Sequence, residues 1–281
     1  MKFRIQHHTR YQYMEKIFLE PHVIRLLPRR DNHVNLISKS VNICPEPIGV
    51  NEILENNGTV SLFAWFKGMT NIFDIKTDVL ITMDSFNPFD FLVYPSSGLR
   101  LPIIYSTDLS AVLTPYFNFN QEDPSIRLFA QNLAESCGQE TVPFLINLCR
   151  IIYEEFSYEK REKGAPYQPA ETLKHKKGSC RDFTVFAMAV CREMGFACRY
   201  VSGYYVSENP DEPGELHAWM EVFLPGAGWK GFDPSHGIAC DHHHIALSAS
   251  ADPARTLPVT GSFRGFSSSR MDTDVMIQPV Q

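Results

Sequence analysis

The stretch that decides the fold is GSCRDFTVFAMAVCREMGFACRY, residues 178–200. Its apolar residues recur at helical spacing and form one broad stripe, made of Phe183, Phe186, Ala187, Val190, Cys191 and Met194. Ser179 is a favourable N-cap residue and Gly195 is a typical helix terminator, so the helix is expected to begin at Cys180 and to end before residue 195. We therefore expect a helix that is central to its domain and carries a cysteine in its first turn.

The position of Cys180 allows two interpretations. Cysteine is among the most often buried residue types, so this side chain could serve packing alone. However, the first turn of a helix has unpaired N–H groups and the positive end of the helix dipole, which stabilise an anion. Because the thiolate is the nucleophilic form of cysteine, this position also suits a catalytic thiolate. The rest of the chain has to decide between the two.

A catalytic thiol needs a base, and the base needs a group that orients it. The sequence ELHAWMEVFLPGAGWKGFDP, residues 215–234, reads as two strands joined by a turn near residue 226. If these strands form an antiparallel hairpin, His217 and Asp233 lie at similar distances from the turn. Asp233 would then accept a hydrogen bond from one ring nitrogen of His217 and leave the other facing Cys180. This is the arrangement that a Cys-His-Asp triad requires.

Along the rest of the chain, the spacing of apolar residues changes near residue 123 from strand-like alternation to helical spacing. Short alternating strands separated by turn residues predict a β-sandwich in the first part of the chain, with strands at residues 3–13, 21–30, 34–45, 59–66 and 73–83. Beyond residue 123, helical spacing predicts helices at 124–137 and 141–158, and strands are expected at 196–206, 215–224 and 228–234. The fold class is thus α+β. We expect two domains. Residues 1–122 form a sandwich-like domain with a connecting segment that starts at residue 86 and packs across the surface. Residues 123–281 form the second domain, which includes a tail from residue 246 that wraps the outside.

Composition excludes several classes of function. The 281 residues are 44% hydrophobic and carry a formal net charge of −6, without the clustered basic face that nucleic-acid binding needs. No apolar run is long enough to cross a membrane, and the N-terminus has no apolar core of a signal peptide. The seven cysteines are irregularly spaced, which is typical of reduced thiols in a cytoplasmic protein.

Four motifs carry a resemblance to a known family. These are G-x-C-x-D at the helix start, M-G-F-x-x-R-x-V-S-G-Y, H-A-W-x-E-V and G-W-x-x-x-D-P, which together span residues 178–234. In this order they resemble the core of the transglutaminase-like superfamily, which has a papain-type fold. The segments FRIQHHTRYQY and VIRLLPRR also resemble the β-rich N-terminal domain of bacterial members. The resemblance implies a core in which a central helix packs on an antiparallel sheet.

Carried over residue by residue, the resemblance implies that Cys180 is the nucleophile, His217 the general base and acid, and Asp233 the orienting carboxylate. Asp182 matches an acidic residue of the motif and is interpreted as structural. The remaining candidates would contact the substrate: Trp219 as a wall of the site, and Tyr158, Tyr167 and Gln168 as candidates for a second oxyanion donor.

The function implied is acyl transfer from an amide or peptide bond through a thioester, more in keeping with hydrolysis than with crosslinking. The partner would be a peptide or protein substrate, without cofactor or metal.

Two other interpretations stay open at this point. In ACDHHHIAL, residues 239–247, an extended backbone would direct Cys240, His242 and His244 to one side, where they could bind zinc. The domain could also be a non-catalytic scaffold that binds peptides or proteins, although all three triad positions carry competent residue types.

Overall fold

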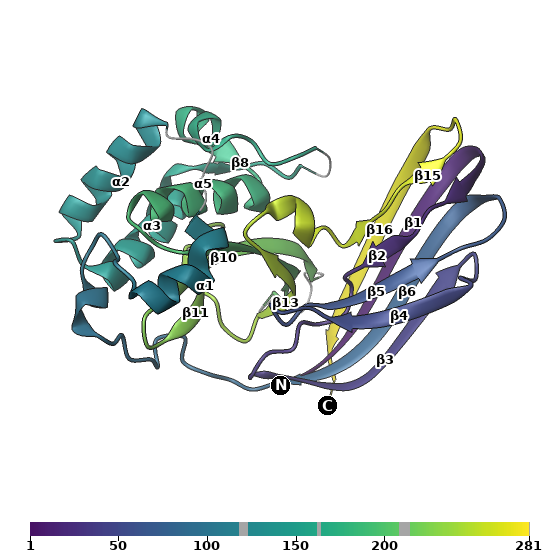
Figure 1. The fold of residues 1–281 in the computed structure, drawn as a ribbon, viewed down its shortest axis with the longest axis horizontal. Coiled ribbons are helices and arrows are strands. Elements are labelled where there is room, and N and C mark those ends of the chain that lie inside the picture. The colour runs from purple at the N-terminus through teal and green to yellow at the C-terminus, as the bar shows by residue number, and fades with distance from the viewer. Residues whose placement is uncertain (118–122, 162–163, 208–213, 281) are drawn as a thin grey trace.

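The computed structural model describes residues 1–117, 123–161, 164–207 and 214–280. The molecule has two parts side by side, a β-sandwich of long strands and a part in which helices cover a sheet (Figure 1). The predicted domain boundary at residues 122 and 123 falls next to residues 118–122, which lie outside the described residues.

The first sheet of the sandwich is built on the long strand β1, whose alternating residues are buried. Its strand order is β15–β1–β6–β3, and β16 also pairs with β1. The strands are β1 (Lys2–Leu19), β3 (Val34–Cys44), β6 (Thr70–Met83), β15 (Phe263–Arg264) and β16 (Ser269–Pro279).

The second sheet has the order β14–β2–β5–β4. Its strands are β2 (His22–Ile24), β4 (Gly49–Leu54), β5 (Val60–Trp65) and β14 (Val259–Thr260). Apolar residues of both sheets form one buried core, which includes Phe3, Ile5, Leu62, Ala64, Ile75 and Val79. The sandwich predicted from alternation is therefore present, with β4 as a strand where the sequence predicts a turn.

The C-terminal strands complete this sandwich. β16 pairs antiparallel with β1 from Phe3 opposite Pro279 to Tyr13 opposite Ser269, and the two strands run side by side in Figure 1. The structure thus places residues 259–279 with the N-terminal strands, whereas the sequence pattern predicts them in the domain of residues 123–281. The reason is that β16 is an edge strand, mostly exposed on both faces, so it has little apolar alternation to mark it.

The second part contains the sheet that holds the candidate site. Its strand order is β12–β11–β10–β9–β13, and all its pairings are antiparallel. The strands are β9 (Cys198–Tyr205), β10 (Glu215–Leu224), β11 (Gly228–Asp233), β12 (Ile238–Ala239) and β13 (His244–Ser250). A short parallel pair, β7 (Ser157–Tyr158) and β8 (Lys177–Gly178), leads into the central helix.

Helices pack on this sheet around a common apolar core. They are α1 (Thr107–Phe117), α2 (Pro124–Ser136), α3 (Thr141–Glu155), α4 (Pro169–His175) and α5 (Cys180–Glu193), with short 3₁₀ turns η1 (Ser96–Leu99) and η2 (Pro253–Thr256). The apolar stripe of α5 is buried as its spacing predicts. The expected α+β fold, with a central helix packed on an antiparallel sheet, is confirmed. None of the described helices is both long and apolar enough to cross a membrane.

The segment before α2 contributes to this second core. Leu101, Ile103, Tyr105 and Leu113 are buried in it, and the Tyr105 hydroxyl donates a hydrogen bond of 2.7 Å to the carbonyl of Phe223. The segment predicted to connect the domains over the surface is therefore packed into the helical part along much of its described length.

Candidate active site

Cys180 is the first residue of α5, directly after the N-cap residue Ser179. Its side chain is mostly buried, with the residue 8% exposed. The N-terminal turn of a helix favours an anion at this place, because its N–H groups have no partner within the helix. The local structure expected from the sequence is therefore present, with the thiol in the first turn of the helix.

Asp182 fixes the start of this helix. Its Oδ2 accepts hydrogen bonds of 2.7 Å from both the backbone N–H and the hydroxyl of Ser179. Its Oδ1 accepts one of 2.7 Å from the backbone N–H of Tyr167 and one of 2.8 Å from Arg161. The carboxylate is fully buried. These four contacts support the structural role that the sequence suggested for Asp182.

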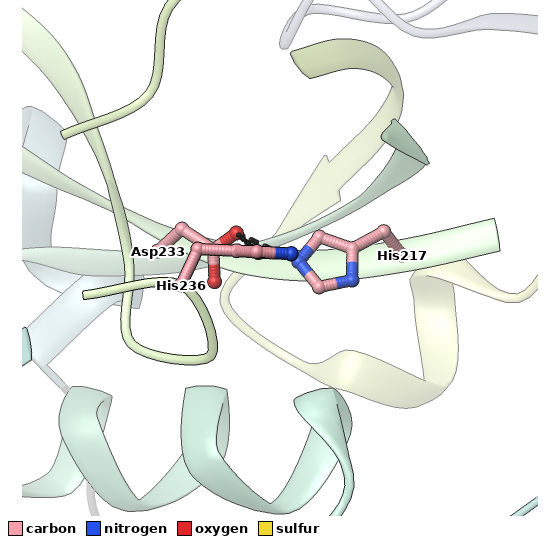
Figure 2. A group of neighbouring side chains, drawn as sticks. All are labelled: His217, Asp233 and His236. Carbon is pink, nitrogen blue, oxygen red and sulfur yellow. Dashed lines mark hydrogen bonds and ion pairs between the residues drawn. The ribbon is translucent and has the colours of Figure 1, made fainter. Parts of the chain in front are cut away.

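His217 and Asp233 meet across the hairpin of β10 and β11. The hairpin pairs Met220 with Phe232 and Leu224 with Gly228, so Asp233 lies near His217 at the end of the strands away from the turn. Nε2 of His217 lies 2.7 Å from Oδ2 of Asp233. Figure 2 shows the imidazole and the carboxylate directed toward one another. Both side chains are buried.

The second ring nitrogen of His217 is left for the thiol. Nδ1 is buried and has no hydrogen-bond partner of normal geometry among the described residues. The Cys180 side chain is nevertheless close enough to interact with the imidazole. Hydrogen bonds of a catalytic site are often long before the substrate binds, so a loose Cys180–His217 contact is compatible with proton transfer.

Burial and charge act in opposite directions on His217 and Asp233. Burial disfavours the charged imidazolium, but the carboxylate of Asp233 and, to a lesser degree, Cys180 raise the pKa of His217 to about 10. Burial also disfavours the Asp233 carboxylate, yet its histidine contacts hold the pKa of Asp233 well below the usual range. The arrangement therefore favours an imidazolium beside a carboxylate.

Two further histidines contact Asp233: His236, for which the sequence predicts no role, and His244, which the sequence suggests only as a zinc ligand. Nδ1 of His236 lies 2.7 Å from Oδ2, and Nε2 of His244 lies 3.1 Å from the same atom. Figure 2 shows the contact between His236 and Asp233 as a dashed line. His236 follows Asp233 by three residues in a turn, a spacing that could have been noticed. His244 reaches the site through the pairing of β13 with β9 and gives no such local signal.

The residues proposed as substrate contacts have different surroundings. Tyr158 contacts both the side chain and the backbone of Cys180; burial above all, then the charges of Cys180 and Glu215, raise the pKa of Tyr158. Tyr167 instead packs its ring under Arg161, 3.7 Å from ring centroid to guanidinium carbon. Gln168 is the N-cap residue of α4. Tyr158 is thus the member of this group whose described contacts include Cys180.

Trp219 lies behind the histidines. It is 2% exposed, shares a strand face with His217, and its ring centroid is 5.2 Å from that of His244. Gly203 lets the indole approach the backbone closely, because a Cβ there would be 2.4 Å from the Trp219 ring. Trp219 is therefore a buried packing neighbour of His244, and its contact with a substrate stays a prediction.

The alternative zinc site at Cys240, His242 and His244 is not supported. Residues 242–243 form a turn instead of continuing a strand, and Nε2 of His244 is directed to Asp233. Among the described residues these three side chains do not form a group with ligand atoms within 4.8 Å of one another. Asp241, His242 and His243 do form such a group, but there Asp241 already accepts a hydrogen bond from the His243 ring at 3.0 Å.

Comparisons with known proteins give matches for both parts of the chain. Residues 128–234 match the transglutaminase-like superfamily, and residues 3–82 match the bacterial transglutaminase-like N-terminal region. Uncharacterized proteins of Mycobacterium tuberculosis and Mycobacterium bovis are 24% identical over an alignment of 298 residues, which covers 100% of this chain and 93% of each relative. A protein-glutamine gamma-glutamyltransferase of Pseudomonas aeruginosa is 27% identical over 126 residues, covering 42% of this chain and 19% of that enzyme.

A solved structure has the same fold over the whole chain. It comes from Cytophaga hutchinsonii and was solved under the provisional description of a cysteine protease. Its TM-score is 0.71 at 19% identity, with 100% of this chain and 92% of that chain covered. With the family matches to both of its parts, the chain belongs to the transglutaminase-like superfamily and carries the bacterial transglutaminase-like N-terminal region ahead of its core.

Proposed function

We propose that this protein is a Cys-His-Asp enzyme that transfers an acyl group from an amide or peptide bond to water through a thioester on Cys180. The observation that carries the proposal is the 2.7 Å contact between His217 and Asp233, with Cys180 at the first position of α5 beside the same imidazole. Members of the superfamily act on peptide or protein substrates, which supports the same substrate class here.

The chemistry follows from these positions. The Cys180 thiolate attacks the amide carbonyl carbon, and His217 gives a proton from Nδ1 to the leaving nitrogen as the C–N bond breaks. The acyl group is then bound to sulfur as a thioester. His217, now neutral, takes a proton from water, whose oxygen attacks the thioester carbon and releases a carboxylic acid and the thiolate. Asp233 keeps the proton on Nε2 and stabilises the imidazolium throughout.

The developing oxyanion needs hydrogen-bond donors. The backbone N–H of Cys180 is one, and we assign the Tyr158 hydroxyl as the second because it contacts both the backbone and the side chain of Cys180. Tyr158→Phe should lower kcat by roughly 10²–10³ and leave KM nearly unchanged, since this donor is used mainly in the transition state. Tyr153→Phe is the matched control, because Tyr153 is an exposed tyrosine of the helix just upstream. Equal kcat values for Tyr158→Phe and wild type would exclude this assignment.

The nucleophile is tested by the rate at which iodoacetamide labels each cysteine, followed by mass spectrometry as a function of pH. We expect Cys180 to be labelled well below the pH at which the exposed Cys44 reacts, and this advantage to disappear in His217→Ala. His175→Ala is the control, since His175 lies in the last turn of α4 away from the triad. Labelling of Cys180 that is indifferent to His217 would reject the triad and favour a binding scaffold.

The acceptor is tested separately. Water needs no binding site of its own, which is why we propose hydrolysis over crosslinking. With dimethylated casein and a fluorescent alkylamine, hydrolysis predicts release of ammonia or new peptide ends without amine incorporation. Incorporation of the amine that depends on Cys180 would instead identify a transamidase.

We extend the proposal to a cytoplasmic location, which rests on the thiols. All seven cysteines are free, including the exposed Cys44, as expected for a reducing compartment. Fractionation of the producing cells tests this, and recovery in an extracytoplasmic fraction would contradict it.

A further inference from the structure

One carboxylate oxygen of Asp233, Oδ2, lies within hydrogen-bond distance of three imidazole nitrogens. Nε2 of His217 and Nδ1 of His236 each lie 2.7 Å from Oδ2, and Nε2 of His244 lies 3.1 Å from it. The other oxygen, Oδ1, accepts the backbone N–H of Ser235 at 2.8 Å. Because a carboxylate oxygen has about two lone-pair positions, Oδ2 is fully used by these three rings.

His244 is held more firmly than a surface side chain could be. It is the first residue of β13, and its side chain is only 1% exposed. Its ring centroid is 5.1 Å from that of Tyr205 on β9 and 5.2 Å from that of Trp219 on β10, both in edge-on packing. This packing leaves the ring few other orientations.

The hydrogen bonds of His244 also fix where its proton lies. The backbone N–H of Asp241 donates to Nδ1 at 3.2 Å, so in the neutral ring Nδ1 is the acceptor and Nε2 carries the proton. Burial opposes charge here, but Asp233 and Asp241 outweigh it and raise the pKa of His244 to about 9. In the charged ring, Nδ1–H would face Oδ1 of Asp241, 3.4 Å away. Both states therefore keep a proton on Nε2 for Asp233.

We propose that His244 is a positioning residue, which through Nε2–H holds Oδ2 of Asp233 where it orients His217 toward Cys180. This rests on the proposed function, since it assigns His244 a part in the same triad. The charged and titratable groups around the ring are Asp233 from β11, Asp241 from the preceding loop and His217 from β10, with His236 and His243 close by.

His236 is the useful contrast within the same cluster. It contacts the same oxygen, yet its side chain is 32% exposed. If His236 is removed, water can reach Asp233 and replace the lost donor, whereas the buried place of His244 offers no such replacement. The two histidines should therefore differ in their effect although their contacts look alike.

The test compares His244→Phe, His244→Gln and His236→Ala in the full-length protein. The phenyl ring fills the space without a donor, while the amide of glutamine offers an N–H near the place of Nε2. We expect His244→Phe to slow iodoacetamide labelling of Cys180 near neutral pH by roughly 10- to 100-fold, the range seen when an outer hydrogen bond to a site residue is lost. His244→Gln should recover most of the rate, and His236→Ala should remain within a few fold of wild type.

A second readout does not depend on turnover. The downfield proton resonance of the N–H between His217 and Asp233 should be lost or broadened in His244→Phe and restored in His244→Gln. His22→Phe is the control for loss of a buried histidine, since His22 is 5% exposed and lies in the sandwich. It should leave both the labelling and the resonance unchanged.

Two results would overturn the proposal. One is wild-type labelling and an unchanged resonance in His244→Phe. The other is equal impairment of folded His244→Phe and His244→Gln, because that would mean His244 acts by its shape alone. If the proposed triad itself is wrong, the result is different: Cys180 would be labelled at the same rate in wild type and in His217→Ala. In that case the resonance still reports whether His244 positions Asp233.

Discussion

Asp233 is the side chain on which the charge of the site depends, because it is fully buried and accepts from three imidazoles. Asp233→Asn keeps the shape but removes the charge and brings an NH₂ group toward histidine N–H groups. Under the proposed mechanism, we expect kcat to fall by roughly 10³–10⁴ with little change in KM, because the imidazolium and the tautomer of His217 lose their support. The measurement is steady-state kinetics on a peptide amide substrate.

The control for this charge change is Asp252→Asn. Asp252 accepts from the backbone N–H of Ala254 at the start of η2 and is exposed. It removes the same charge away from Asp233, so its kcat should match wild type. A kcat of Asp233→Asn within tenfold of wild type would show that Asp233 is not needed to orient His217.

At this scale the sequence predicts three residues that the structure brings together, but not the side chains around them. Cys180 is marked by a helix start, and His217 and Asp233 by their symmetric places about a turn, all of which are local patterns. His236 and His244 could not be assigned in the same way. The place of His244 depends on the turn at residues 242–243 and on the pairing of His244 with Tyr205 of β9, and both are set by tertiary structure.

At the scale of single elements, the start of α5 depends on one carboxylate. Asp182 accepts four hydrogen bonds from Ser179, Tyr167 and Arg161, and it is fully buried. Asp182→Ala leaves these donors without a partner and Arg161 without its counter-charge. We expect a loss of about 3–5 kcal/mol in the free energy of unfolding, the usual result of breaking a buried ion pair. Denaturant unfolding measures this loss.

The matched control for Asp182→Ala is Asp123→Ala. Asp123 is also an N-terminal capping residue, for α2, but its contact with the Ser125 N–H is exposed. Removing an exposed cap of this kind costs about 1 kcal/mol. If the two variants were equally stable, the buried network around Asp182 would not be what holds the helix start.

The helices and strands differ in how clearly the sequence predicts them. α2, α3 and α5 have apolar stripes, and each begins at the predicted residue, but α3 ends at Glu155 instead of residue 158 because Ser157 and Tyr158 form β7. β4 was taken for a turn because it is an edge strand with five of its six residues exposed. α1 has a proline at position 115 and only Leu113 buried, so helical spacing was not visible there. A local sequence pattern does not predict an element whose residues are mostly exposed, because no buried face imposes a regular spacing of apolar residues.

At the scale of the whole molecule, a buried ion pair network joins the sandwich to the sheet of strands β9–β13. Glu221 of β10 accepts from Arg29 at 2.7 and 3.1 Å and also from Arg199 of β9. Arg29 lies just after the short strand β2 and is 6% exposed. In addition, the backbone N–H of Arg29 donates to the carbonyl of Ala246 in β13 at 2.7 Å. The N-terminal domain is thus bound to the two strands that also carry His217 and His244.

Glu221→Gln should therefore weaken the whole molecule. Two buried guanidinium groups would lose their shared counter-charge, and we expect a loss of about 3–5 kcal/mol in the free energy of unfolding. Glu52→Gln is the control, since its pair with Lys39 lies at the surface and should contribute less than about 1 kcal/mol. Similar unfolding midpoints for the two variants would mean that the buried network does not stabilise the contact between the domains.

The same contact between domains should also be sensitive to acid, through His7. This side chain of β1 is 1% exposed, with Nδ1 2.8 Å from the Tyr204 hydroxyl of β9 and Nε2 2.7 Å from the Thr9 hydroxyl. Burial, with a smaller contribution from His8, lowers the pKa of His7 from 6.5 to about 4. The folded protein therefore holds His7 neutral, while the unfolded chain binds a proton below pH 6.5.

His7 therefore makes the folded protein less stable as the pH is lowered. Between pH 6.5 and about 4 the unfolded state binds more protons at His7, so stability falls as the pH is lowered, by about 3 kcal/mol in all. The raised pKa values of His217 and His244 act on the alkaline side, because their stabilisation is complete below 6.5 and is lost as the pH rises toward about 10 and 9. Glu221, whose pKa is lowered to about 2, stabilises the fold above 4.5 and loses this effect at lower pH.

Unfolding by denaturant across this pH range tests the role of His7. His7→Gln, which cannot titrate, should remove most of the decline between pH 6.5 and about 4, whereas the wild type should show it. His175→Gln, a change of an exposed histidine in α4, should keep the wild-type decline. If His7→Gln declines as steeply as wild type, the acid sensitivity belongs to other groups. If the decline is absent from His7→Gln, acid destabilises the wild-type protein where the neutral His7 of β1 contacts Tyr204 of β9, in the sheet that also holds His217 and Asp233.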